Sequence, residues 1–257
     1  FVANYTGTNA NIQVTPALNG CFGQTINFVI AVNDIPTVML PANQTVCAGA
    51  PVSIVFSGTN GAMFDWANSD ASIGLGISGT GDISFTAANV ATPTLANLAV
   101  TPTAFGCTGA TQNFSITVNP VPSVSAPGNQ TACAGATVLV SFSGTSGASF
   151  DWTNSNTAIG LGASGTGNIS FPGTNSGNAP LTANLVVTPT LNGCPGAAQN
   201  FSITINPLPT LVVNNTTCAS DLMSYSINAT STATMFTSSA GTVTGSGVYN
   251  ITNILLV

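Results

Sequence analysis

Short runs in which hydrophobic and polar residues alternate recur along the whole chain. Phe114, Ile116 and Val118 alternate with Ser115, Thr117 and Asn119, and Val138 and Val140 begin a similar run. Alternation with a period of two places one set of side chains on each face of a β-strand. Glycine-rich and proline-containing segments separate the runs, and no stretch has a convincing helical period of about 3.6 residues. The pattern predicts an all-β protein built from short strands.

A long internal repeat determines the expected domain organisation. The sequence NQTVCAGAPVSIVFSGTNGAMFDW recurs 86 residues later as NQTACAGATVLVSFSGTSGASFDW. The text FGCTGATQNFSITVNP returns 87 residues later as NGCPGAAQNFSITINP. The difference of one residue predicts an insertion in a loop within 171–179. Repetition of one unit at a fixed period indicates a tandem array.

Two complete units make up most of the chain, and we call residues 36–121 the first repeat and 122–208 the second repeat. Residues 1–35 match the second half of a unit, so we expect the C-terminal part of a repeat that begins before the given sequence. Residues 209–257 start like a unit (LVVNNTTCASD) and then diverge, which predicts the N-terminal part of a divergent β-sandwich module. Proline-bearing junctions (NDIPT, NPVPS, NPLPT) predict short, stiff connections.

Each repeat combines roughly seven short strands with one central tryptophan, which is the pattern of an immunoglobulin-like β-sandwich. Phe64 and Trp66 share one face of a predicted strand in the first repeat. Phe150 and Trp152 do so in the second repeat. We predict that these four side chains belong to the cores of tandem immunoglobulin-like β-sandwich domains in an extended array.

Charge is nearly absent, which narrows the possible functions. The chain has no Lys, Arg, His or Glu, and six Asp are its only charged side chains. Without cations we expect no nucleic-acid partner, and without imidazole the usual general base and metal ligand are missing. Hydrophobic residues make up 44% of the chain, enough for a packed core. No run reaches the ~18 apolar residues of a membrane-spanning helix. We predict no enzyme activity, no cofactor and no membrane insertion of this segment.

The cysteines predict disulfides and therefore an extracellular or cell-surface location. A zinc site is a poor interpretation because no CxxC motif and no histidine exist. Disulfides persist in oxidising compartments outside the cytoplasm. The six cysteines are Cys21, Cys47, Cys107, Cys133, Cys194 and Cys218.

Two pairing patterns fit the cysteine positions. Pairing within a repeat gives Cys47–Cys107 and Cys133–Cys194 and leaves Cys21 and Cys218 for partners outside the given sequence. Pairing across junctions gives Cys21–Cys47, Cys107–Cys133 and Cys194–Cys218. We favour the first pattern, because a repeat that folds as a unit should carry its own cross-link, which would stabilise it by about 4 kcal/mol for a ~60-residue loop. The second pattern would lock neighbouring domains together.

Asp65 and Asp151 precede the tryptophan in both repeats and are the candidate ligand-binding carboxylates. They could bind calcium or a sugar, but clustered carboxylates of the DxDxDG type are absent. A glycosidase usually needs two carboxylates across a cleft. We favour solvent-facing strand residues that hydrogen-bond a turn.

Trp66 and Trp152 could form a sugar-stacking platform, but each lies on the same strand face as a phenylalanine, which favours a position in the core. Serine catalysis is not indicated, since no GxSxG motif exists and no His or Lys could activate a serine. Glycosylation sequons are frequent in a chain so rich in Asn and Thr. They include Asn43, Asn113, Asn129, Asn168 and Asn200.

Several motifs carry a resemblance to a known class of repeat: NQTVCAGA, FDWANSD, VTPT, FGCTGA and FSITVNP. These resemble the PKD-like, immunoglobulin-fold repeats of very large cell-surface proteins in Bacteroidota, which include gliding-motility and attachment adhesins exported by the type IX secretion system. The resemblance covers residues 1–208 well and 209–257 weakly. It implies a stalk or adhesive filament at the cell surface, and the class has no catalytic motif.

We therefore predict a non-catalytic structural or adhesive segment of a large secreted surface protein, serving adhesion or gliding motility. The expected partners are neighbouring repeats of the same chain, laterally associated copies, and surface polysaccharide or other cells. Two alternatives remain. One is an array of carbohydrate-binding modules in a secreted enzyme, and the other is a self-assembling pilus or sheath subunit whose half-domains are completed by the next chain.

Overall fold

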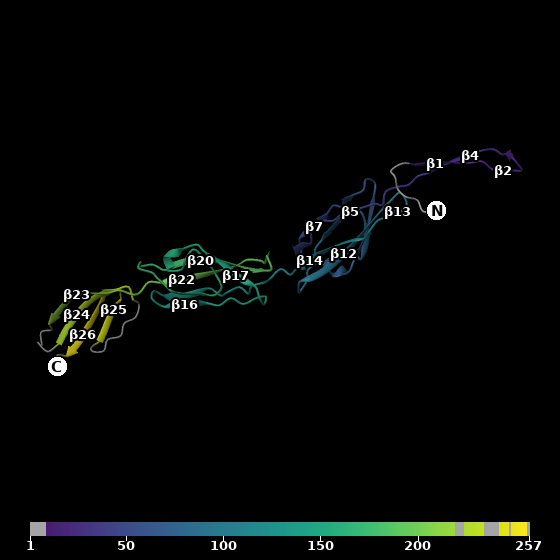
Figure 1. The fold of residues 1–257 in the computed structure, drawn as a ribbon. Coiled ribbons are helices and arrows are strands. Elements are labelled where there is room, and N and C mark those ends of the chain that lie inside the picture. Colours follow the sequence, from purple (N-terminus) through teal and green to yellow (C-terminus); the bar gives the residue numbers. More distant parts are fainter. Residues whose placement is uncertain (1–8, 219–223, 234–241, 247, 256–257) are drawn as a thin grey trace. The chain divides into compact units, whose positions relative to one another are not determined.

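The structure, a computed structural model, describes residues 9–218, 224–233, 242–246 and 248–255 (Figure 1). The regular elements in these residues are β-strands and two short 3₁₀ helices. The chain divides into two compact units. The first comprises Phe1–Ser123, Thr145–Ala148 and Pro189–Gly196, and the second comprises Val124–Gly144, Ser149–Thr188 and Ala197–Val257.

The larger sheet of the first repeat has the strand order β10-β9-β12-β14-β6, and β13 pairs with the end of β12. All pairs in this sheet are antiparallel except β14 with β6. Its strands are β6 (Gln44–Cys47), β9 (Met63–Asn68), β10 (Ser78–Thr80), β12 (Thr94–Ala104), β13 (Cys107–Thr108) and β14 (Gln112–Asn119). Two small sheets accompany it: β7 (Pro51–Ile54) with β11 (Ile83–Thr86), and β5 (Val38–Met39) with β8 (Ser57–Gly58).

A hydrophobic core joins the larger sheet to the β7–β11 pair, which makes the first repeat a β-sandwich. Leu98 of β12 and Ile116 of β14 are fully buried, and they belong to the same core cluster as Ile54 of β7 and Ile83 of β11. The predicted alternation is present, since Phe114, Ile116 and Val118 are all buried. The period-two pattern thus produces strands with one face in the core.

The second repeat has the same strand order, β15-β22-β20-β17-β18, with β21 paired to β20 and with a separate β16–β19 sheet. Val138 and Val140 are buried in its core, whereas Leu139 between them is 67% exposed. The predicted inserted residue falls in the loop 173–180. The strands are β15 (Gln130–Cys133), β16 (Thr137–Val140), β17 (Ser149–Asn154), β18 (Ser164–Thr166), β19 (Ile169–Pro172), β20 (Leu181–Leu191), β21 (Cys194–Pro195) and β22 (Gln199–Asn206).

Strands on either side of the two repeats complete the chain. Before them, β1 (Ala10–Val14) pairs with β4 (Ile26–Ile30), and β2 (Ala17–Leu18) pairs with β3 (Cys21–Phe22). After them, an antiparallel sheet has the order β23-β24-β26-β25. Its strands are β23 (Leu211–Cys218), β24 (Ser224–Ser231), β25 (Thr242–Ser246) and β26 (Val248–Leu255). The all-β prediction of tandem immunoglobulin-like sandwiches is confirmed.

Each of three segments begins with the same hydrogen bond from a backbone N–H to a threonine hydroxyl 22 residues later. The region that starts at residue 209 therefore begins with the same hydrogen bond as the two repeats, although its later sequence diverges. The three pairs are Thr37 to Thr59, Ser123 to Thr145 and Thr210 to Thr232, with N···Oγ1 distances of 2.9, 2.9 and 3.0 Å.

Candidate functional site

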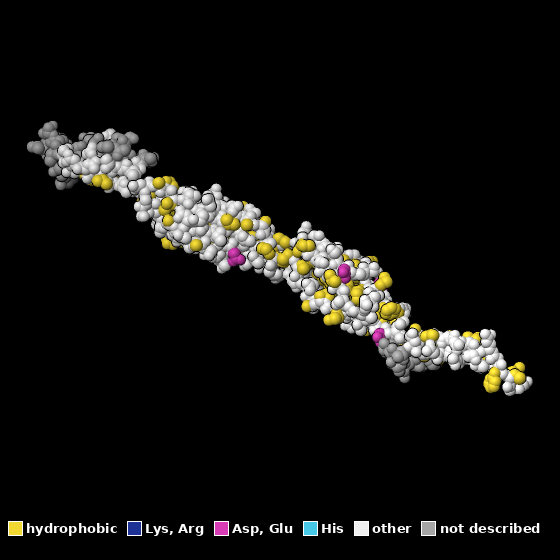
Figure 2. All heavy atoms as spheres, turned by 90° about the horizontal axis from the view of Figure 1, so that it is seen from above, with side chains coloured by type: hydrophobic (Ala, Val, Ile, Leu, Met, Phe, Trp, Pro, Cys, Tyr) yellow, Lys and Arg dark blue, Asp and Glu magenta, His cyan; other side chains and the backbone are white. Residues whose placement is uncertain are grey.

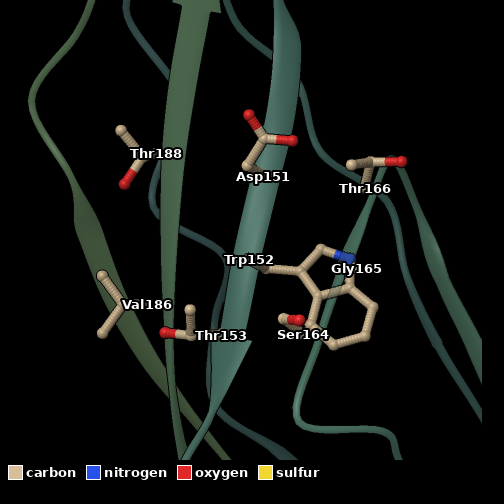
Figure 3. Close-up of a pocket in the computed structure, with 8 residues that line it drawn as sticks. All are labelled: Asp151, Trp152, Thr153, Ser164, Gly165, Thr166, Val186 and Thr188. Atoms are coloured by element: carbon tan, nitrogen blue, oxygen red, sulfur yellow. The ribbon is translucent and has the colours of Figure 1, made fainter.

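The tryptophan of the second repeat is packed against a glycine and is not available as a stacking platform. Trp152 on β17 is 8% exposed, and its Nε1 donates a hydrogen bond of 3.1 Å to the carbonyl of Gly167. Its ring lies beside Gly165 of β18 (Figure 3), where a Cβ atom would come within 2.3 Å of Cζ2. A sugar ring would find no free indole face there.

The first repeat has the same packing with one polar difference. A Cβ atom on Gly79 would lie 2.2 Å from Cζ2 of Trp66, which is half-buried. Its indole Nε1 is buried and has no hydrogen-bond partner in the structure. Phe64 and Phe150 are half-buried and pack against the cores of their own repeats.

Asp65 and Asp151 lie on the outer faces of their sheets, and both side chains are exposed. Asp151 borders a hollow of about 340 Å³ together with Thr153, Val186 and Thr188 (Figure 3). On the face drawn in Figure 2 the acidic side chains in view are isolated spots, and the sequence has no Lys, Arg or His to surround them. No group of three or more His, Cys, Asp or Glu side chains within the described ranges could hold a metal ion.

Other aspartates hold turns by accepting backbone hydrogen bonds. Asp70 caps the 3₁₀ helix η1 (Ala71–Ile73), its Oδ1 accepting from the backbone N–H of Ser72 at 2.9 Å. The side-chain and backbone hydrogen bonds of Ser72 lower the pKa of Asp70 below its usual value. Asn156 caps η2 (Thr157–Ile159) in the same way. The cap therefore requires an oxygen acceptor and not a charge.

A second Asp/Asn pair supports the same conclusion. Asp82 Oδ1 accepts a hydrogen bond of 2.9 Å from the backbone N–H of Phe56. Asn168 Oδ1 accepts one of 2.9 Å from the backbone N–H of Phe142. Both side chains fix the strand that leads to a core phenylalanine, so the predicted sequon at Asn168 has its amide oxygen engaged in the fold.

A buried asparagine at the end of each tryptophan strand is a structural residue that the sequence analysis missed. Asn154 is 9% exposed, and its Nδ2 donates to the carbonyls of Leu161 and Gly162 at 3.0 and 3.2 Å. Its Oδ1 accepts from the backbone N–H of Asn156 at 3.0 Å. Asn68 makes the same contacts in the first repeat. The repeated texts FDWAN and FDWTN carried the signal.

The disulfide differs from both predicted patterns, because Cys47 is bonded to Cys194. It links the end of β6 in the first repeat to a hairpin of the second repeat, across 147 residues of sequence. Cys107 and Cys133 have free thiols, as does Cys21. The predictions Cys47–Cys107, Cys133–Cys194, Cys21–Cys47 and Cys107–Cys133 are therefore wrong. The side chain of Cys218 lies outside the described residues, but Cys194 is already bonded elsewhere, so Cys194–Cys218 is excluded as well.

Strand register explains why a repeat does not close its own disulfide. Cys47 is paired with Asn119 at the end of β14, whereas Cys107 comes before β14 begins. The 8 residues of β14, at about 3.3 Å each, place the two cysteines some 25 Å apart. A disulfide needs Cα atoms within ~7 Å. The Cα atoms of Cys47 and Cys194 are 5.5 Å apart.

The cysteine hairpin, residues 189–196, makes three contacts within the first compact unit. Cys194 is 2% exposed and carries the disulfide. The backbone carbonyl of Asn192 accepts a hydrogen bond of 3.2 Å from Nδ2 of Asn119. A Cβ atom on Gly196 would lie 1.9 Å from the carbonyl oxygen of Pro122, so the hairpin is seated on the proline junction. Asn119 is only 5% exposed, although the alternation predicted a polar outer position, because the hairpin covers it.

The three hairpins that carry a cysteine share one turn geometry. Each has two consecutive residues with positive φ, as in a type I′ turn. The first turn residue is Asn19, Phe105 or Asn192, with φ of 54, 50 and 50°. A glycine follows in every case.

No protein-family model and no curated protein sequence matches the chain. Solved structures with tandem immunoglobulin-like or fibronectin-III-like domains are similar at low identity. Dpr2 Ig1-Ig2 in complex with DIP-Theta Ig1-Ig3 matches at 10% identity and a TM-score of 0.40, covering 87% of this chain and 90% of that one. Chicken CNTN1 FN1-FN3 matches at 10% and 0.40, covering 77% and 76%. Fibronectin(III)-like modules of Clostridium thermocellum CbhA match at 14% and 0.33, covering 67% and 95%.

Within the part of the chain that the structure describes, no helix has the length and apolar character needed to cross a membrane. The fold assignment rests on the sheets and cores described above, and the site that distinguishes this chain is the disulfide between Cys47 and Cys194.

Proposed function

We propose that this chain is a non-catalytic, load-bearing and adhesive repeat segment of a large secreted cell-surface protein, acting in a stalk or filament. The observation that carries the proposal is the Cys47–Cys194 disulfide, which links consecutive repeats covalently. The resemblance to Bacteroidota gliding and attachment adhesins exported by the type IX system agrees with this function. Neighbouring repeats, surface polysaccharide and other cells are the proposed partners.

The disulfide changes how the chain would carry tension. A force applied to its two ends passes from Cys47 directly to Cys194, so the residues between these two positions carry no load. This shielded segment contains every strand of the first repeat from β7 onward and β15 to β20 of the second repeat. A stretched surface protein would thus keep most of both sandwiches folded without relying on their own stability.

Two further features support an exposed, non-catalytic role. Disulfides form and persist in oxidising compartments, which favours a location outside the cytoplasm. Asp70, Asp82 and their asparagine counterparts serve as backbone hydrogen-bond acceptors. Carbohydrate-binding modules are less well supported, because Trp66 and Trp152 are packed against glycines.

Single-molecule stretching of the full chain tests the load-bearing proposal. With the disulfide intact we expect the extended chain to be roughly 500 Å shorter than its full contour, because the bonded cysteines have a sequence separation of 147 and each bypassed residue would add about 3.4 Å. Addition of a reductant, or the Cys194→Ser substitution, should restore this length.

The matched control is Cys107→Ser, which removes a thiol that is not bonded and should leave the shorter extension unchanged. Full extension of the oxidised wild-type chain would overturn the proposal. Equal lengths before and after reduction would overturn it as well.

A further inference from the structure

The outer face of the larger sheet in the second repeat carries one carboxylate between two hydroxyl groups. Asp151 of β17 is the register partner of Thr166 on β18. Thr188 lies on β20, the strand on the other side of β17, and borders the same hollow (Figure 3). Neighbours across strands have Cβ atoms about 5 Å apart, so one ligand group can contact all three side chains. We call Thr166, Asp151 and Thr188 the threonine–aspartate row.

The first repeat has the same three residue types, although a neighbouring position on the same face differs. Asp65 is the register partner of Thr80 on β10 and of Thr101 on β12. Two positions further along the strand, Ala67 in the first repeat is replaced by Thr153 in the second. The arrangement of one aspartate between two threonines is therefore repeated while its surroundings vary.

The aspartate of this row differs from the other aspartates of the repeats, because the fold makes no use of its side chain. Asp70 and Asp82 accept backbone hydrogen bonds, and asparagine does the same at both equivalent positions. Within the described residues, the side chains of Asp151, Thr166 and Thr188 make no hydrogen bond. Asp151 is exposed, and the sequence has no Lys, Arg or His to neutralise it. Both repeats thus retain a negative charge where no hydrogen bond of the fold requires one.

The row of the second repeat has both hydroxyls available, whereas its counterpart in the first repeat has one engaged. Thr101 Oγ1 and Thr111 Oγ1 are hydrogen-bonded at 2.7 Å. Ala198 occupies the position of Thr111 in the second repeat. Thr188 therefore has no such competitor, and we place the binding site in the second repeat.

The row forms one side of a hollow that is larger than a single functional group. The hollow has a volume of about 340 Å³, within the range of small-molecule sites, roughly 300–1,000 Å³. Ser164, Thr153 and Val186 form its other side (Figure 3). Val186 is 37% exposed, so an apolar side chain is open to a ligand there. This combination suits a polar ring that carries a charged group.

The row matches a primary ammonium group better than a metal ion or a neutral sugar. An ammonium has one positive charge and three N–H donors, and the row offers one carboxylate and two hydroxyl oxygens as acceptors. Calcium takes roughly 6–8 oxygen ligands, and the described part of the chain has no group of three or more His, Cys, Asp or Glu that could hold a metal ion. A neutral sugar has no charge to pair with Asp151.

We propose that the threonine–aspartate row binds the protonated amine of an amino sugar in a surface polysaccharide. The amine donates to the carboxylate and to both hydroxyl oxygens of the row, and the sugar ring lies over Thr153 and Val186. The site needs no aromatic stacking platform, so burial of the tryptophan does not oppose it. The inference rests on the proposed function, since it names the chemical class of the polysaccharide partner.

Titration of the full chain with a glucosamine hexasaccharide, followed by nuclear magnetic resonance, tests the inference. A weakly acidic buffer keeps the amines protonated and leaves carboxylates ionised. We expect chemical-shift changes in β17, β18 and β20, from which the dissociation constant is obtained. The N-acetylglucosamine hexasaccharide has the same rings without the positive charges and should cause no such changes. Absence of binding by the glucosamine hexasaccharide would overturn the inference.

Two substitutions and a matched control locate the contact. Asp151→Asn should weaken binding about tenfold, the effect of losing a hydrogen bond to a charged group, and Thr188→Val about threefold. Asp70→Asn removes the same charge at a cap where Asn156 already serves in the second repeat, and it should leave binding unchanged. Equal weakening by Asp151→Asn and Asp70→Asn would show attraction to the net charge alone and overturn the inference. Binding that Asp151→Asn does not weaken would overturn it as well.

An N-acetylated hexalysine separates an amino sugar from a lysine of a partner protein. It has the same number of ammonium groups but no ring to fill the hollow. We therefore expect hexalysine to bind the row more weakly than the glucosamine hexasaccharide does. Equal or tighter binding of hexalysine would overturn the assignment to an amino sugar.

Failure of this inference can be distinguished from failure of the proposed function. The stretching experiment reports the Cys47–Cys194 disulfide, whereas the titration reports the threonine–aspartate row. A shielded length together with no glucosamine binding would overturn only the assignment of the partner. Glucosamine binding by a chain without a shielded length would overturn the load-bearing function and support the binding site.

Discussion

The two repeats have the same strand order but differ in charge at two equivalent positions, and the geometry is the same at both. Asp70 and Asn156 each cap a 3₁₀ helix, and Asp82 and Asn168 each accept from the backbone before a core phenylalanine. A carboxylate and an amide therefore do the same work here. The comparison teaches that Asp70 and Asp82 serve the fold as hydrogen-bond acceptors.

The cysteines show the opposite case, because the same residue stands at the equivalent position of both repeats but its bonding state differs. Cys47 and Cys133 occupy equivalent strand ends, yet only Cys47 is bonded. Their own repeats supply the same backbone to each. Cys47 is bonded to a hairpin of the second repeat and Cys133 is not bonded, so the bonding state of these two cysteines depends on contacts outside their own repeats and not on the local backbone.

We expect the largest loss of stability from breaking the disulfide that Cys47 forms and Cys133 does not. Cys194→Ser should lower the free energy of unfolding by about 5 kcal/mol, because the loop that loses its closure is long. Urea unfolding followed by tryptophan fluorescence would measure the change. Cys133→Ser, the equivalent change at a free thiol, should cost almost nothing, and equal losses in the two variants would contradict the assigned pairing.

The buried asparagine should be the next most sensitive position. Asn154→Ala leaves the carbonyls of Leu161 and Gly162 without their donor and should destabilise the second repeat by about 3 kcal/mol. Thermal unfolding of the full chain would show the loss. Asn68→Ala should cost a similar amount in the first repeat, and the exposed Asn184→Ala is the control. A stable Asn154→Ala protein would mean that water satisfies these carbonyls.

How much of this could be predicted from the sequence depends on how far apart the interacting residues are. Alternation within single strands was enough to predict the strands, the buried faces and the sandwich fold. Asn119 was placed wrongly by the same rule, because its burial depends on Asn192, which is 73 residues away in sequence. The disulfide was missed because it depends on the parallel pairing of β14 with β6, which no local pattern encodes.

The structural asparagines illustrate a different limit. Asn68 and Asn154 are repeated in both copies, but asparagine is so common in this chain that the repetition carried little weight on its own. Their role follows only from the turn that folds back over them, where one amide reaches several carbonyls. The glycines beneath the tryptophans were missed for a similar reason, since cross-strand pairing places them there.

Replacing the glycine against which the tryptophan packs should cause a loss of stability of intermediate size. Gly165→Ala places a methyl group 2.3 Å from the ring of Trp152 and should destabilise the second repeat by about 1–3 kcal/mol through overpacking. Gly128→Ala is the matched control, because a Cβ atom there has no neighbour within 4 Å. Near-ultraviolet circular dichroism would follow the tryptophan environment. An unchanged spectrum and stability would show that the ring can move aside freely.

The turn of the first repeat should be improvable. Phe105 holds a φ of 50° and is 67% exposed, whereas the other two cysteine hairpins have asparagine at this position. Asparagine tolerates the left-handed region better than phenylalanine does. Phe105→Asn should therefore stabilise the first repeat by about 1 kcal/mol, measured by urea unfolding. The reverse change, Asn192→Phe, should destabilise, and a loss of stability in Phe105→Asn would contradict the strain argument.

The smallest expected effect concerns charge itself and returns to the first comparison. The pKa of Asp70 is lowered in the folded protein by the side-chain and backbone hydrogen bonds of Ser72. A group with a lowered folded pKa stabilises the fold above its unfolded pKa, near 3.8, and loses this contribution as the pH falls through the folded value. Asp70→Asn should leave stability at pH 7 nearly unchanged, because Asn156 already caps η2. The variant should lose less stability than the wild type between pH 5 and pH 2, as measured by urea unfolding across that range.

The exchange Asn156→Asp should add an acid-sensitive component to the stability of the second repeat. If stability fell equally with decreasing pH in all three proteins, the hydrogen bonds of Ser72 would not distinguish the charged cap from the neutral cap.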